Sequence, residues 1–148
     1  MSMRIKSRAC FGILLSIVFI LMSSPVFSTP ESARLLYKAI EVGDLDKAKV
    51  LLAGTDVNAQ DSLGYTPLYK AVFYDRLDFV KYLFELGANV NLGDTEGLAS
   101  LHVAALENLP GMIKILKNKG ADIEAKDNYG YTPLHLAEIK VASMQHNN

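Results

Sequence analysis

An internal repeat with a constant period constrains the fold of this chain more than any other feature. An eight-residue segment recurs with its glycine at positions 64, 97 and 130, in the forms GYTPLYKA, GLASLHVA and GYTPLHLA. A second landmark, which also starts with glycine, begins at positions 54, 87 and 120. Both landmarks keep the same step over three periods. This agreement predicts a stack of similar structural units.

Each period carries the signals of two helices. Thr66 and Thr132 are placed to cap a helix, and each is followed by a proline, which is tolerated at the first helical position. A second helix is predicted from about Leu77 to Glu85, because apolar residues recur there at helical spacing. Gly87 then offers the left-handed backbone that ends a helix at little cost. One unit is therefore a helix, a turn, a second helix and an extended loop.

The period and the Thr-Pro-Leu-His core at 132–135 resemble the ankyrin repeat, and the resemblance covers about residues 33–141. It implies an all-α fold, a solenoid of about 3.5 helix-turn-helix repeats with short β-turn or hairpin tips. The expected organisation is a signal peptide (1–28), a repeat domain (29–141) and a polar tail (142–148). Within the domain the repeats are placed at 31–63, 64–96 and 97–129, with a partial repeat at 130–141.

The chain departs from the family pattern at the turns and at one helix start. The turn between the two helices of a repeat carries a glycine in the family, and the matching residues here are Gly43, Asp75 and Asn108. Aspartate and asparagine tolerate a positive φ best among the other residues, so the turn should be kept. Ala99-Ser100 replaces Thr-Pro in the third repeat. This predicts a weaker helix start, with Ser100 as the remaining candidate cap.

The ends of the array differ from its middle. The first repeat lacks Thr-Pro and aligns only when the common step is shortened by one position, and terminal capping repeats often depart from the others in this way. In the last repeat Val141 occupies the turn position, and the chain ends at Asn148. We therefore expect the second helix of that repeat to be absent. The stack should fold, but it should fray from its C-terminal end.

Residues 1–28 have the order of a secretory signal peptide. Three basic residues precede an uncharged stretch from Ala9 to Met22, and small residues then lead to an expected cut after Ser28. For a prokaryotic source, this predicts export to the periplasm or secretion from the cell. The alternative is an uncleaved anchor in the inner membrane formed by residues 9–27. It is disfavoured because a spanning helix needs roughly 20 apolar residues, and the uninterrupted stretch has 14.

Charge and cysteine content narrow the classes of partner. Cleavage would remove three of the 15 basic residues and none of the 16 acidic ones, which leaves a net charge of −4. A mildly acidic domain without a basic cluster argues against nucleic-acid binding. Cys10 is the single cysteine, so the cleaved domain folds without a disulfide. Membrane contact is expected only if the signal segment stays uncleaved.

No catalytic site, metal site or cofactor is expected. His102 and His135 stand at equivalent positions of adjacent repeats, where stacked helices lie about 8–10 Å apart. Two nitrogens on one zinc ion lie only about 3–3.5 Å apart, and the resemblance implies that this histidine hydrogen-bonds around the Thr-Pro turn. Asp61, Asp94 and Asp127 recur three residues before each glycine, as turn-forming residues do. The chain is therefore not expected to be an enzyme.

The resemblance implies a protein partner on a concave face, which is built from the loop tips and the exposed side of each first helix. Large apolar residues occur at these positions although the scaffold does not require them, and exposed apolar surface marks interaction sites. The candidate partner-binding residues are Leu63, Tyr65, Phe73, Tyr74, Leu98, Leu106, Tyr129 and Tyr131. Tyr65, Phe73, Tyr74 and Tyr129 are the expected anchors. The alternative, packing against neighbouring tips or the last repeat, weighs most for Tyr131 and for Ile139.

The leading hypothesis is an exported protein-binding module without a cofactor, whose partner is another protein. It would stabilise or inhibit a resident enzyme, or engage a host protein. Two alternatives stay open: a fragment of an interrupted longer ankyrin gene with no independent function, and a membrane-tethered ankyrin scaffold. The half-covered C-terminal end could also pair with a second copy of the chain.

Overall fold

The structure, a computed structural model, describes residues 30–145. The predicted signal peptide therefore lies outside the described residues, as do the last three residues of the predicted tail. Seven helices fill the described part: α2 (Pro30–Val42), α3 (Leu45–Leu52), α4 (Pro67–Phe73), α5 (Leu77–Glu85), α6 (Ser100–Leu106), α7 (Pro110–Asn118) and α8 (Pro133–Gln145). Within residues 30–145 no helix has both the length and the apolar character that crossing a membrane requires.

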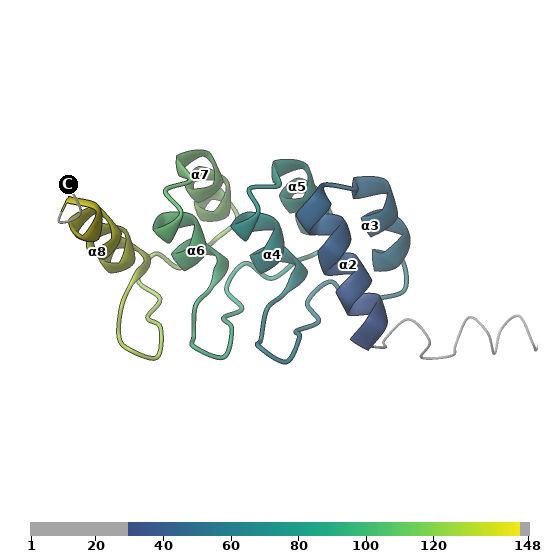
Figure 1. The fold of residues 1–148 in the computed structure, drawn as a ribbon, viewed down its shortest axis with the longest axis horizontal. Coiled ribbons are helices and arrows are strands. Elements are labelled where there is room, and N and C mark those ends of the chain that lie inside the picture. Colours follow the sequence, from purple (N-terminus) through teal and green to yellow (C-terminus); the bar gives the residue numbers. More distant parts are fainter. Residues whose placement is uncertain (1–29, 146–148) are drawn as a thin grey trace, which may run out of the picture.

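The helices form two rows that run along the molecule (Figure 1). One row holds the first helix of each repeat, and α2, α4, α6 and α8 pack on one another in that order. The other row holds α3, α5 and α7. The loops that join one repeat to the next project away from both rows, below them in Figure 1. The predicted all-α repeat fold is confirmed.

Local sequence signals explain where the helices of the second repeat begin and end. Thr66 caps α4, since its hydroxyl oxygen accepts a hydrogen bond from the Tyr69 N–H at 3.0 Å, and Pro67 occupies the first helical position. Asp75, with a φ of 53°, makes the turn to α5. α5 has the predicted bounds, and Gly87 follows its end with a φ of 86°. The expected turn chemistry of this repeat is therefore confirmed.

The start of α6 differs because Ala99 stands at the cap position and forms no side-chain cap. Ser100 is instead the first helical residue and is almost fully buried. The expectation that Ser100 caps this helix is wrong, because the backbone places the cap one residue earlier. The ring of His102 supports the turn, with Nδ1 accepting the Ala99 N–H at 3.1 Å. α6 spans seven residues, as α4 does, and Asn108 makes the next turn with a φ of 53°.

The last helix, α8, is longer than α4 and α6, the first helices of the two preceding repeats. α8 spans 13 residues, against seven for α4 and α6. Val141 stands where Asp75 and Asn108 make their turns, and a β-branched residue disfavours positive φ, so the helix runs on to Gln145. Residues 142–145, which the sequence assigned to a polar tail, are therefore helical. The described part of the chain ends with this helix.

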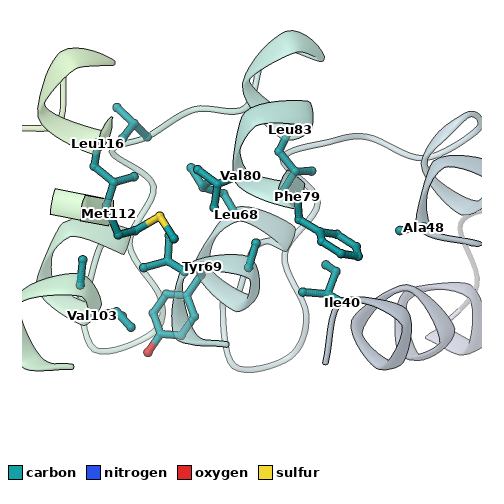
Figure 2. Packing of buried hydrophobic residues seen from close by; sticks show 14 of the residues in the cluster. Ile40, Ala48, Leu68, Tyr69, Phe79, Val80, Leu83, Val103, Met112 and Leu116 are labelled. Atoms are coloured by element: carbon teal, nitrogen blue, oxygen red, sulfur yellow. The ribbon is translucent and has the colours of Figure 1, made fainter. Parts of the chain in front are cut away.

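The hydrophobic core lies between the two rows of helices. Figure 2 shows Leu68 and Ile40 of the first helices facing the second helices, from which Val80 and Phe79 point toward them. Leu68, Leu83 and Leu116 are at most 1 % exposed. The buried cluster draws residues from α2 through α7 and, within the described chain, none from α8. Repeat stacks gain stability from contacts between neighbours, and α8 packs on α6 without adding a side chain to this buried cluster.

Candidate protein-binding surface

Three aspartates build the loop tips in the same way. One carboxylate oxygen of Asp61 accepts hydrogen bonds from the N–H groups of Leu63 and Tyr65, both at 2.9 Å. Asp94 and Asp127 repeat this pattern in the next two loops. The predicted turn-forming role of these aspartates is confirmed. Each tip therefore holds the residues two and four positions after its aspartate in a fixed arrangement.

Hydrogen bonds between neighbouring loops join the tips into one surface, here called the tip row (residues 61–65, 94–98 and 127–131). The Thr95 N–H donates to the Leu63 carbonyl at 3.1 Å, and the Asn128 N–H donates to the Glu96 carbonyl at 2.8 Å. Gly64 allows this approach, because a Cβ at that position would lie 2.7 Å from the Thr95 nitrogen. A surface that is held in this way loses little conformational freedom on binding.

The two histidines inside the array support the loops. The fully buried His102 accepts the Ala99 N–H at Nδ1, and its Nε2 lies 3.1 Å from the Ala125 carbonyl oxygen. In the last repeat, Nδ1 of His135 accepts the Thr132 N–H at 3.1 Å. The implied structural role of both histidines is confirmed. Across residues 30–145 the structure groups no three His, Cys, Asp or Glu side chains that would hold a metal ion.

None of the eight predicted partner-binding residues is fully buried. The exposed ones are Leu63, Phe73, Tyr129 and Tyr131. The half-buried ones are Tyr65, Tyr74, Leu98 and Leu106. Five of the eight lie in the tip row, whereas Phe73 and Leu106 end α4 and α6 and Tyr74 directly follows α4. Tyr131 and Ile139, for which packing was the stronger alternative, are 43 % and 49 % exposed.

At the N-terminal end the structure adds residues that the sequence reasoning missed. The rings of Tyr65 and Tyr69 have centroids 4.5 Å apart, and Tyr37 of α2 donates its hydroxyl to the Tyr65 carbonyl at 2.7 Å. Nζ of Lys70 lies 3.9 Å from the centroid of the Tyr65 ring and 5.8 Å from that of Tyr37. The signal was present in the sequence, because the shortened step of the first repeat aligns Tyr37 and Lys38 with Tyr69 and Lys70.

Tyr37 and Tyr69 both hold their phenolic protons strongly. Burial, followed by the charge of Asp61, raises the pKa of Tyr37 well above its ordinary value. Burial, followed by the charge of Asp94, raises the pKa of Tyr69 in the same direction. The Tyr37 hydroxyl therefore stays a donor at neutral pH, as its hydrogen bond to the Tyr65 carbonyl requires. The first repeat is thus joined to the second by a neutral hydrogen bond.

A groove of about 230 Å³, here called the α2–α4 groove, is lined by Arg34, Tyr37, Lys38, Glu41, Lys70 and Tyr74. Phe73 stands beside it, in edge-to-face contact with Tyr74 and with ring centroids 5.1 Å apart. The ring of Tyr65 contacts Lys70, which is one of the lining residues. Of the four predicted anchors, Tyr74 lines the groove, and Phe73 and Tyr65 each contact one of its lining residues. Tyr129, the fourth, lies on the tip two repeats further along.

The first helices lose their aromatic character toward the C-terminal end. One and two periods after Tyr74, the equivalent positions hold Glu107 and Lys140. These two side chains form an ion pair that joins the residue after α6 to α8, with Nζ of Lys140 3.1 Å from a carboxylate oxygen of Glu107. On this side of the molecule the aromatic groups come from the tip row, where Tyr129 is 71 % exposed and Tyr131 lies edge-on to His135.

Stacked helix pairs place the chain in the class of helical repeat solenoids. The chain belongs to the ankyrin-repeat family, since its sequence matches the family described as "Ankyrin repeats (3 copies)" over residues 9–94, 35–127 and 86–143. No curated protein matches the chain significantly. Ankyrin repeats are in general protein–protein interaction modules, and proteins built from them are generally non-enzymatic scaffolds.

Proposed function

We propose that this protein is an exported binding module that holds a protein partner on the concave face formed by the tip row and the first helices. The observation that carries the proposal is exposed aromatic surface, because Phe73 and Tyr129 are 49 % and 71 % exposed although the core needs neither. Aromatic residues at such positions dominate the binding energy of interfaces. The proposed ligand is a protein, bound without a cofactor and without nucleic acid.

The rigidity of the tip row also supports the proposal. Association is weakened by the loss of side-chain and loop freedom, and a surface that is ordered beforehand avoids part of that cost. In the tip row the aspartates already hold the N–H groups of residues such as Tyr65 and Tyr131. The loops are also bonded to one another. The binding energy of the aromatic side chains is therefore available to the complex.

The test is an affinity capture from the native source with the tagged full chain and two double variants. Phe73→Ala/Tyr74→Ala removes two anchors beside the α2–α4 groove. Val50→Ala/Leu86→Ala is the matched control, because these apolar side chains are 70 % and 42 % exposed, with Val50 in α3 and Leu86 directly after α5. We expect the wild type and the control to capture the same protein, and the first variant to lose it.

Both variants should stay folded, with a loss in unfolding free energy below about 2 kcal/mol, as is usual for substitutions outside the core. A capture that survives Phe73→Ala/Tyr74→Ala would refute the assignment of this face. A collapse in stability would show instead that the two side chains belong to the core.

Export is a separate part of the proposal, and it rests on the order of residues in 1–28. The proposed location is the periplasm or the medium, with the chain cleaved before Thr29. N-terminal sequencing of the protein recovered from each cell fraction tests it. A chain that starts at Thr29 outside the membrane fraction supports cleavage. A chain that keeps Met1 in the membrane fraction supports the anchor at 9–27 and refutes cleavage.

A further inference from the structure

Lys70 occupies a position that the following repeats fill with an apolar side chain. One and two periods later this position holds Val103, which is 4 % exposed, and Leu136, which is half-buried. Lys70 is itself half-buried, with its ammonium group against the ring of Tyr65 and near that of Tyr37. Withdrawing a charge from water costs more than withdrawing an aliphatic side chain. The third and last repeats therefore show that the fold does not require a lysine here, although the first repeat also places one, Lys38, at the aligned position.

Lys70 also has no acidic partner within the described part of the chain. The ion pairs found there are Arg34–Glu31, Lys38–Glu41 and Lys140–Glu107. The Asp61 carboxylate accepts N–H groups of its own tip through Oδ1, and it is not a member of these three ion pairs. A ring face attracts the ammonium charge but does not neutralise it. The charge of Lys70 is thus available to a carboxylate that comes from outside the chain.

The α2–α4 groove combines this charge with aromatic walls. Its lining holds three basic residues and one acidic residue, and Arg34 and Lys38 are already paired with glutamates of α2. The volume of about 230 Å³ is below the range of about 300–1,000 Å³ that is usual for small-molecule pockets. A single side chain therefore fits the groove better than a cofactor does. The net charge of −4 over residues 29–148 disfavours an extended polyanion.

We propose that the α2–α4 groove binds an acidic residue of the protein partner that is flanked by an aromatic or aliphatic residue. The carboxylate accepts hydrogen bonds from Nζ of Lys70, and the apolar neighbour packs on Phe73 and Tyr74. A pair that forms at a half-buried lysine is screened less than an exposed one. Losing a hydrogen bond between charged groups should then weaken binding about tenfold. This inference rests on the proposed function and adds the chemistry of the partner.

The experiment pans a phage-displayed library of random linear peptides against the immobilised full chain. The same library is panned against Lys70→Met and Lys81→Met. Methionine suits position 70 because valine and leucine occupy it in the third and last repeats. Lys81 is an exposed lysine of α5 in the second-helix row, so its variant is the matched control. We expect the wild type and Lys81→Met to select peptides with aspartate or glutamate beside an apolar residue. Lys70→Met should select peptides without acidic enrichment.

A double-mutant cycle then measures the contact itself. One selected peptide and its version with the acid replaced by the amide are titrated against the wild type and Lys70→Met. On the wild type the amide peptide should bind about tenfold more weakly, whereas on Lys70→Met the two peptides should bind equally. Lys70→Arg should restore the preference for the acid.

The outcomes separate this inference from the function on which it rests. If the selected peptides need Phe73 and Tyr74 but show no acidic preference, the binding face stands and the role of Lys70 is refuted. An acidic preference that persists in Lys70→Met refutes that role as well. If no peptide is selected by any chain, the groove does not bind a linear acidic segment, and the inference falls. The capture of a folded partner would still test the proposed function independently.

Discussion

A hydroxyl added at position 99 should stabilise the protein, because Ala99 occupies a helix cap without a capping side chain. Its backbone, with φ −78° and ψ 166°, is close to that of Thr66, with φ −90° and ψ 163°. Thr132 shows that a threonine fits beside a histidine of this array, since its Oγ1 lies 3.1 Å from Nδ1 of His135. Ala99→Thr should therefore form the cap that Thr66 forms in the preceding repeat.

The size of the gain follows from what the His102 N–H does at present. This N–H already donates to the Ala99 carbonyl at 2.9 Å. In Ala99→Thr it would donate to the threonine hydroxyl instead, so the variant replaces one hydrogen bond by a better placed one and does not add a bond. A capping threonine contributes about 0.5–2 kcal/mol over alanine, and we expect the lower end, about 0.5–1 kcal/mol. In a domain of this size that raises the thermal midpoint by roughly 2–4 °C. The reverse change, Thr66→Ala, should cost about 1 kcal/mol.

Urea unfolding of the full chain, followed by far-UV circular dichroism, measures these differences. Ala99→Val is the matched control, because valine has the shape of threonine without the hydroxyl. If valine stabilises the protein as much as threonine does, added apolar packing is the cause and the capping argument fails. If threonine destabilises it, the buried site at Ala99, which is 5 % exposed, lacks room beside His102.

Two further predictions concern the core and the tyrosines. Leu83→Ala, at a fully buried position, should lower the unfolding free energy measured in urea by about 2–5 kcal/mol. Val50→Ala, at an exposed position, should change it by no more than about 0.5 kcal/mol. Similar losses for the two variants would refute the assigned core. The raised pKa values of Tyr37 and Tyr69 mean that above about pH 10 the unfolded chain releases protons that the folded chain keeps. These two groups should therefore leave the unfolding free energy unchanged below about pH 10 and lower it above that pH, and Tyr69→Phe should reduce the fall. An unchanged fall would refute this cause.

The parts of the structure that follow from local backbone chemistry could be predicted from the sequence. The bounds of α5 and the positive φ of Asp75 and Asn108 depend on residues only a few positions apart, and all were predicted correctly. The same holds for the tip aspartates, such as Asp61, which bond to N–H groups two and four residues later. A repeat helps further, because each copy tests the interpretation of the others.

The failures occur where the repeat pattern changes. The length of α8 was missed because the polar composition after Ala142 suggested a tail, although Val141 gives the helix no reason to stop. The cap position of Ala99 was missed because serine is a common capping residue, and Ser100 was therefore predicted to be the cap. The cluster of Tyr37 and Lys70 depends on how the first repeat packs on the second, and a one-residue offset in the period hid that register.

A comparison of equivalent positions in successive repeats shows which side chains the ankyrin scaffold requires and which it allows to vary. Where the backbone repeats and the side chain does not, the fold tolerates the variation, as at the position that holds Tyr74, Glu107 and Lys140 in turn. Lys70 and the pair Phe73–Tyr74 occur together in the second repeat only, beside the groove that the first repeat completes. The side chains that the scaffold does not need are therefore concentrated where two repeats meet. On this reasoning, the specificity of the proposed binding face belongs to the α2–α4 end rather than to the whole array.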